Sequence, residues 1–127
     1  MTNYHQQETL YQAQSRATNG ARVYVIMQGA RLAARLSFHY SRSNQSCTAY
    51  LWIEGAGISK GVARGGGYDR MTHAAYKAAA NPAPLTLGDI DGMKERRDAI
   101  LAALSHDDGH DWQWHLHEAG FTVYSAI

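Results

Sequence analysis

The stretch RLAARLSFHY, residues 31–40, carries the most regular alternation of side chains in the sequence. Side chains two positions apart lie on the same face of a strand, so a pattern of this length predicts a β-strand with one buried face. We expect the buried face to hold Leu32, Ala34, Leu36, Phe38 and Tyr40, and the other face Arg31, Ala33, Arg35, Ser37 and His39.

Shorter alternating runs around this stretch predict three neighbouring strands, over residues 22–28, 47–54 and 58–63. Gly29 and Ala30 form a two-residue turn of the glycine-first kind, and the next hairpin turns through residues 55–57. Short connections join antiparallel strands, because parallel strands need a long crossover. The sequence therefore predicts an antiparallel meander.

Two helical patterns flank the meander. Residues 6–17 contain no Gly or Pro and favour an N-terminal helix. Residues 70–80 are rich in alanine, follow Asp69 as a suitable N-cap, and end before a proline segment. We therefore expect one helix before the sheet and another directly after its last hairpin.

The C-terminal part predicts further helices and a last strand. Thr86 with Asp89 resembles a capping box ahead of an apolar pattern of helical spacing over residues 90–104. Asp111 is expected to cap a short tryptophan-rich helix, in which Trp112 and Trp114 would pack on the core. The alternating pattern after that helix predicts a strand.

These patterns together predict one α+β domain over residues 1–127. It would hold an antiparallel sheet of four to five strands with an N-terminal helix, two or three helices in the C-terminal half and a final C-terminal strand. That last strand is expected to join the sheet at an edge, where it could also pair across a homodimer.

Composition narrows the class of protein. A hydrophobic content of 45% with 18% charged residues is typical of a globular chain. The single cysteine, Cys47, cannot form an internal disulfide, which fits a reducing compartment. The polar N-terminus and the lack of a long apolar run predict a cytoplasmic protein without a membrane partner.

The net charge of +1 conceals an uneven distribution. Up to residue 90 there are nine Lys and Arg against four Asp and Glu, and from residue 91 there are three against seven. This balance excludes a strongly acidic DNA mimic, and dedicated nucleic-acid binders are usually more basic. Opposite charge at the two ends suits protein recognition or self-association.

The junction between the fourth strand and the following helix, RGGGYDR over residues 64–70, is the first candidate binding site. It lacks the Lys of a phosphate-binding P-loop and does not follow a parallel strand, so it is no dinucleotide fingerprint. Arg64 and Arg70 could donate to an anion or to a partner's carboxylate, with Gly66, Gly67 and Tyr68 as a backbone cradle. The alternative is a tight turn without a ligand.

The outer face of the sheet is the second candidate. Basic and aromatic side chains there could stack bases of a single-stranded nucleic acid or anchor a protein partner. If the N-terminal helix covers this face, it is instead a second core. The side chains expected on this face are Tyr24, Arg35, His39, Tyr50 and Trp52, and we take Arg35, Tyr50 and Trp52 as candidate partner contacts.

The sequence contains no recognised catalytic or metal-binding motif. His106, His110, His115 and His117 lie among aspartates, but their spacing matches no recognised metal site. No nucleophile elbow is present. We therefore expect no enzyme, no cofactor and no bound metal.

The order of elements over residues 6–80 resembles that of a double-stranded RNA-binding domain, and residues 62–75 resemble that family's glycine-rich approach to its last helix. In that family lysines at this helix grip phosphates. The resemblance implies a nucleic-acid-binding module that uses Arg35, Arg64, Arg70 and Lys77 on phosphates. A related alternative is a sponge that binds a signalling nucleotide at the same junction.

The chain also resembles small accessory proteins of phages and plasmids, of the anti-CRISPR and anti-defence type. The likeness rests on the glycine-tyrosine-aspartate turn before an alanine-rich helix, and on the ending with Trp112, Leu116 and residues 120–123. It implies a non-enzymatic inhibitor that binds a host defence protein or ribonucleoprotein complex in the cytoplasm, often as a dimer. This is the function that we expect first.

Overall fold

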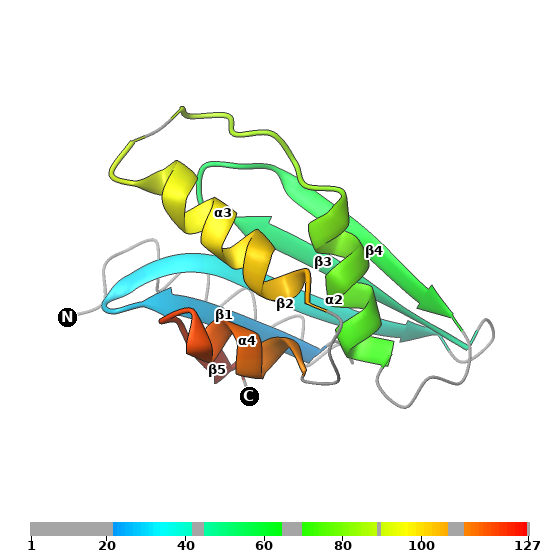
Figure 1. Ribbon diagram of the computed structural model, residues 1–127. Helices are drawn as coiled ribbons and strands as arrows, with labels where there is room; N and C mark the ends of the chain where they lie inside the picture. The colour runs from blue at the N-terminus through cyan, green and yellow to red at the C-terminus, as the bar shows by residue number, and fades with distance from the viewer. Residues whose placement is uncertain (1–21, 42–44, 65–69, 89, 107–110, 127) are drawn as a thin grey trace.

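The computed structural model describes residues 22–41, 45–64, 70–88, 90–106 and 111–126. Within them the chain forms an antiparallel sheet and three helices, an α+β architecture (Figure 1). The elements, in chain order, are β1 (Arg22–Gln28), β2 (Arg31–Ser41), β3 (Ser46–Ile53), β4 (Ile58–Arg64), α2 (Arg70–Ala80), α3 (Met93–Leu104), α4 (Trp112–Glu118) and β5 (Thr122–Ser125).

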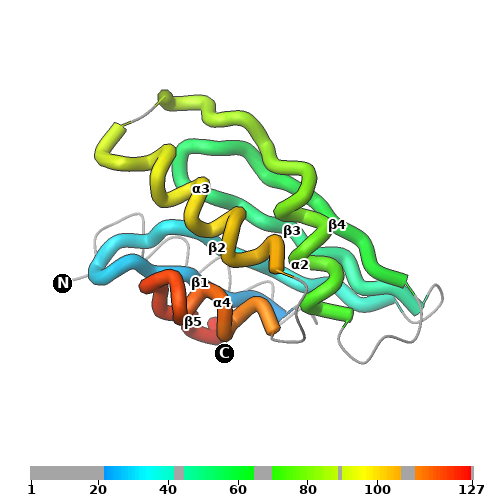
Figure 2. Tube along the Cα trace, in the orientation of Figure 1, coloured from blue at the N-terminus to red at the C-terminus, as the bar shows by residue number. Residues whose placement is uncertain are grey.

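The sheet has the strand order β4-β3-β2-β1-β5, and every neighbouring pair is antiparallel. The first four strands form the predicted meander, and β5 returns after the helices to pair with β1 (Figure 2). Gly29 takes a positive φ of 59° in the two-residue turn between β1 and β2. The C-terminal strand thus lies at one edge of the sheet and β4 at the other.

The described helices all lie on one face of the sheet, with α2 over β3 and β4 and α4 near β1 and β5 (Figure 1). We call this the helix face. It carries the alternating apolar residues of β2 and β3, and Leu36, Leu51 and Ile26 on it are fully buried. The predicted inward face of residues 31–40 is therefore confirmed for Leu32 to Phe38, whereas Tyr40 at the strand end is 55% exposed.

Gly61 sets how closely α2 approaches the sheet. A Cβ atom at this position would lie 2.2 Å from the backbone nitrogen of Ala78 and 2.3 Å from the carbonyl oxygen of Ala74. The facing side of α2 is made of alanines, including Ala74 and Ala78, which are buried. The absent side chain in β4 and the small ones in α2 together let the helix backbone rest on the strand.

Tyr24 lies on the helix face, so its predicted place on the outer face was wrong. The register pairs Tyr24 with Leu36, which puts both side chains on one side of the sheet. Its ring meets Trp112 edge to face at 4.9 Å between centroids, and Phe38 at 6.0 Å. Burial of a large ring in this aromatic group outweighs the polar character of its hydroxyl.

We call the opposite face of the sheet the second face. The solvent exposure of its side chains differs from strand to strand. Val23, Val25 and Ser37 on β1 and β2 are at most 2% exposed. Tyr50 and Trp52 on β3 are partly exposed. The helix predicted over residues 6–17, which was expected to cover this face, lies outside the described residues and stays a prediction.

Helix α3 begins at Met93, later than the predicted capping box implied. The hydroxyl of Thr86 donates to the carbonyl oxygen of Gly55 at 2.9 Å, and its N–H donates to the same oxygen at 2.7 Å. Asp91 and Gly92 then take positive φ values of 53° and 73°, which a helix does not tolerate. Thr86 therefore anchors the loop to the sheet instead of capping a helix.

Helix α4 begins as predicted. The N–H of Trp114 donates to the side chain of Asp111 at 2.8 Å, which confirms the cap. Trp112 is buried against the core, but Trp114 is 43% exposed, so the prediction that both pack inward holds for Trp112 alone. Phe121, just after the helix, is buried as well.

A charged network ties α3 to the hairpin turns at one end of the sheet. Glu54 lies 3.2 Å from Arg31 and 3.9 Å from Arg96, and Arg31 also lies 3.6 Å from Asp91. Hydrogen bonding with Glu54 raises the pKa of the Arg31 guanidinium above its usual value. The Arg96 side chain is only 9% exposed, so its charge depends on Glu54 and on the carbonyl oxygen of Asp91, to which it donates.

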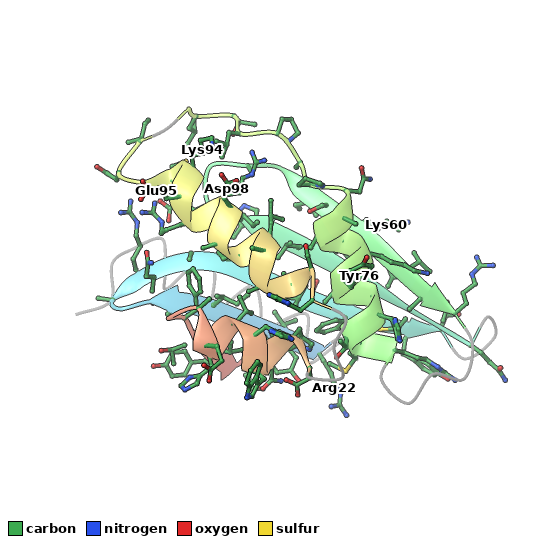
Figure 3. The ribbon with its side chains drawn as sticks, viewed as in Figure 1. Arg22, Lys60, Tyr76, Lys94, Glu95 and Asp98 are labelled. Carbon is green, nitrogen blue, oxygen red and sulfur yellow. The ribbon has the colours of Figure 1, made fainter. Side chains whose placement is uncertain are left out.

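We predict that Glu54→Gln lowers the free energy of unfolding by about 1–3 kcal/mol, because it leaves the buried Arg96 charge without its carboxylate. Urea unfolding followed by circular dichroism would measure the loss. The matched control is Glu95→Gln, which removes an exposed carboxylate from the first turn of the same helix (Figure 3). Equal stability of the two variants would show that the network does not hold α3.

Candidate functional site

The end of β4 and the start of α2 enclose an open pocket of about 160 Å³. Its lining is Ala63 and four basic side chains, Arg64, Arg70, His73 and Lys77, which we call the basic corner. Arg64 is the last residue of β4, and Arg70 is the first residue of α2. The structure therefore brings together the two arginines that the sequence singled out.

Helical spacing places the rest of the basic corner. Arg70, His73 and Lys77 are three and four positions apart, so they form one stripe along α2. The buried alanines on the opposite side of α2 turn this stripe outward, and His73 and Lys77 are exposed. The same packing that fixes α2 on the sheet thus presents the basic corner to solvent.

Tyr40, at the end of β2, positions one member of the corner. Arg70 Nη1 donates to the hydroxyl of Tyr40 at 2.7 Å, and the guanidinium carbon lies 5.3 Å from the centre of the ring. A planar guanidinium that stacks on a ring and donates to its hydroxyl loses much of its rotational freedom. Arg70 is therefore held in place before a partner arrives.

The electrostatic surroundings of the corner are positive. None of the described residues that line the pocket is acidic. Glu95 and Asp98 lie in the first half of α3, far from the start of α2 (Figures 1 and 3). There Lys94 donates to Asp98 at 2.9 Å, and this bond lowers the pKa of the Asp98 carboxyl. Asp98 is thus engaged within α3 and not at the basic corner.

Three predicted members of this site, Gly66, Gly67 and Tyr68, lie outside the described residues, as does the predicted cap Asp69. His73 was not predicted as a member of this binding site, although its helical spacing from Arg70 is a signal in the sequence that points to it. Tyr40 had no such signal, because it is separated from Arg70 by 30 positions.

The aromatic candidates lie on the second face of the sheet, and we call Tyr50, Trp52, His39 and Lys60 the aromatic strip. Lys60 Nζ lies 6.0 Å from the centre of the Tyr50 ring, and His39 meets that ring edge to face at 5.3 Å. Arg35 lies 5.8 Å from the centre of the Trp52 ring but is only 8% exposed. Arg35 therefore lies beside Trp52 and is mostly buried, whereas we expected it as a partner contact.

The chain was compared with family models, curated proteins and solved structures. None of them matches it. Its function is therefore argued from the residues and distances above.

Other candidates of the sequence carry no site within the described parts of the chain. No group of three His, Cys, Asp or Glu side chains among the described residues could hold a metal ion. His106 and His115 stack with their ring centres 4.2 Å apart, and Cys47 is buried on the helix face. Among the described helices, none is long and apolar enough to span a bilayer.

Proposed function

We propose that this protein is a non-enzymatic inhibitor from a phage or plasmid that binds a bacterial defence complex through its basic corner. The observation that carries the proposal is the open pocket with four basic side chains. Arg64 and Arg70 come from two elements locked together by packing, so the partner meets a preformed surface. Preformed contacts lower the entropy cost of binding.

The chemistry of the corner suits binding more than catalysis. Arginine and lysine are cationic donors that recognise carboxylates and phosphates. Among the described residues that line the pocket, none is a serine, cysteine or carboxylate that could act as a nucleophile. Inhibition then comes from occupying a surface that the defence complex needs.

The target in this proposal is a host defence protein or ribonucleoprotein complex in the host cytoplasm. A positive corner steers the protein toward a negative patch and fixes its orientation. Strand β5 is an edge strand of the sheet among the described residues, and an edge strand can pair with a second copy of the chain, so we include a homodimer in the proposal.

A pull-down tests the proposal directly. The tagged full chain is incubated with lysate of a bacterial host that carries an active defence system, and bound proteins are identified by mass spectrometry. We expect a defence component to be recovered and its activity to fall when the protein is added. Recovery of no defence component, or binding without any loss of activity, would contradict the proposal.

We predict that Tyr40→Phe weakens binding to that target about 3-fold to 10-fold, because Arg70 loses the hydroxyl that orients it. The melting temperature should stay within about 2 °C of the wild type, since the Tyr40 ring is half exposed. Titration calorimetry with the purified target measures the first effect. Tyr124→Phe is the matched control, because Tyr124 is equally exposed but lies on β5.

A further inference from the structure

We infer that the corner and the aromatic strip form one continuous surface that binds single-stranded nucleic acid. Phosphates would contact the basic corner and Lys60, and bases would stack on Tyr50 and Trp52. This inference rests on the proposed function and names the chemistry of the partner, namely an exposed single strand within the defence complex.

The register of β3 and β4 places Arg64 on the same face of the sheet as the aromatic strip. Tyr50 pairs with Lys60, and Ser46 pairs with Arg64, so these side chains belong to one face of the sheet. Arg64 also lines the pocket beside α2. Arg64 therefore links the face that carries the aromatic strip to the basic corner.

The contacts on the strip fit bases and phosphates. Tyr50 and Trp52 are two positions apart on β3, so their rings are neighbours about 7 Å apart along the strand. Every base has a π-face that stacks on such rings without regard to sequence. Lys60 is exposed and lies 6.0 Å from the Tyr50 ring, which places a mobile positive charge where a phosphate would follow a stacked base.

Charge decides between a nucleic acid and a protein as the occupant. Among the described residues, no carboxylate lies within the aromatic strip, and Glu54 beyond its end is paired with Arg31. The core of a protein–protein interface is depleted of charged residues. Here the exposed side chains of Lys60 and Arg64 share a face with the partly exposed rings of Tyr50 and Trp52. The surface is therefore a cationic track with stacking platforms.

The same geometry favours a single strand over a duplex. In a duplex the faces of the bases are stacked on one another, so rings on a sheet cannot reach them. A single strand offers those faces. The surface should thus prefer a single strand over a duplex of the same length.

Fluorescence anisotropy with labelled 12-nucleotide oligo(dT) and oligo(U), and with a 12-base-pair duplex, tests this with the full-length protein. We expect single strands to bind at least about 10-fold tighter than the duplex, with affinity that falls as salt rises. Tyr50→Leu should weaken single-strand binding about 5-fold to 100-fold. Tyr76→Leu is the control, because Tyr76 is an exposed tyrosine on α2, which packs on the other face of the sheet (Figure 3). This change should leave single-strand binding unchanged.

A second variant keeps the test valid if Tyr50→Leu folds poorly. Lys60→Gln changes only an exposed side chain on the edge strand β4, and it should reduce the slope of log affinity against log salt by about 0.7. Lys94→Gln, at the start of α3, should leave the slope as it is.

The outcomes separate this inference from the proposed function. Equal affinity for duplex and single strand, or no effect of Tyr50→Leu and Lys60→Gln, would overturn the nucleic-acid inference. So would recovery of the defence target from lysate treated with nucleases, because the partner would then be a protein. In that last case the proposed inhibitor function stands, whereas an empty pull-down with intact single-strand binding would overturn only the inhibitor function.

Discussion

Gly61→Ala is expected to lower the free energy of unfolding by about 3 kcal/mol, which corresponds to a fall in melting temperature of roughly 10 °C. The new Cβ would lie 2.2 Å from Ala78 N and 2.3 Å from Ala74 O. Both are backbone atoms of a regular helix, so no side-chain rotation can relieve the clash. Either β4 or α2 has to shift, and the packing of both suffers.

The same change should also weaken the basic corner. Arg70, His73 and Lys77 are carried by α2, while Arg64 is carried by β4, so a shift between the two elements separates them. Differential scanning calorimetry gives the stability loss, and target binding by the surviving folded fraction gives the effect on the corner. Loss of both would link the close contact to function.

The matched control is Gly57→Ala, in the turn just before β4. A Cβ there would lie 3.3 Å from the side-chain Cβ of Ala83, a contact that a small loop movement relieves. We expect a loss below about 1 kcal/mol. If Gly61→Ala were as stable as Gly57→Ala, the backbone of α2 would lie farther from Gly61 than it does in the structure.

Features set by neighbours in sequence could be predicted. The bounds Arg70–Ala80 of α2 follow from its alanine pattern and the prolines after it, and they are confirmed. The hairpin between β1 and β2 was predicted from Gly29, because a positive φ at that position favours glycine. Each of these signals lies within a few residues of the feature it decides.

Where both faces of a strand are apolar, the sequence does not show which face points to the helices. In β1, Tyr24 and Ile26 alternate with Val23 and Val25, so either set could point to the helices. The register with β2 settles it, since Tyr24 lies opposite Leu36. An isolated alternating pattern therefore shows that a strand exists but leaves its orientation open.

Contacts between segments that lie far apart in the chain could not be predicted from the sequence either. Thr86 and Asp89 matched a capping box locally, but the carbonyl oxygen of Gly55, which comes from a hairpin turn, binds Thr86 instead. At the corner, Arg64 and Arg70 were predicted and Tyr40 was not, because only the fold brings β2 beside the start of α2. The helix over residues 6–17 stays a prediction.

Charged side chains are arranged differently at the two ends of the sheet. Arg31, Glu54, Asp91 and Arg96 satisfy one another at the end where the hairpins turn and α3 begins. The basic corner, at the opposite end of β4, includes no carboxylate among its described lining residues. Paired charges hold the fold together at the first end, which leaves the second end as the one suited to an outside partner.

The double variant Arg64→Ala with Arg70→Ala is expected to weaken binding to the defence target about 100-fold or more, equivalent to roughly 2.7 kcal/mol. The two guanidinium groups supply most of the hydrogen-bond donors of the corner, and they come from both of its elements. Arg64 is exposed and Arg70 is at a helix start, so stability should change by less than about 1 kcal/mol. Surface plasmon resonance with the purified target measures the affinity.

The control removes the same charge elsewhere, through Arg22→Ala with Lys94→Ala, both exposed and outside the pocket (Figure 3). An equal loss of affinity in both double variants would reflect the lower net charge alone, because each pair of substitutions removes two positive charges. Loss confined to the corner variant requires contact at that place. If the corner variant binds and inhibits like the wild type, the junction is only a turn, and Tyr50 and Trp52 on the second face become the place where the partner is held.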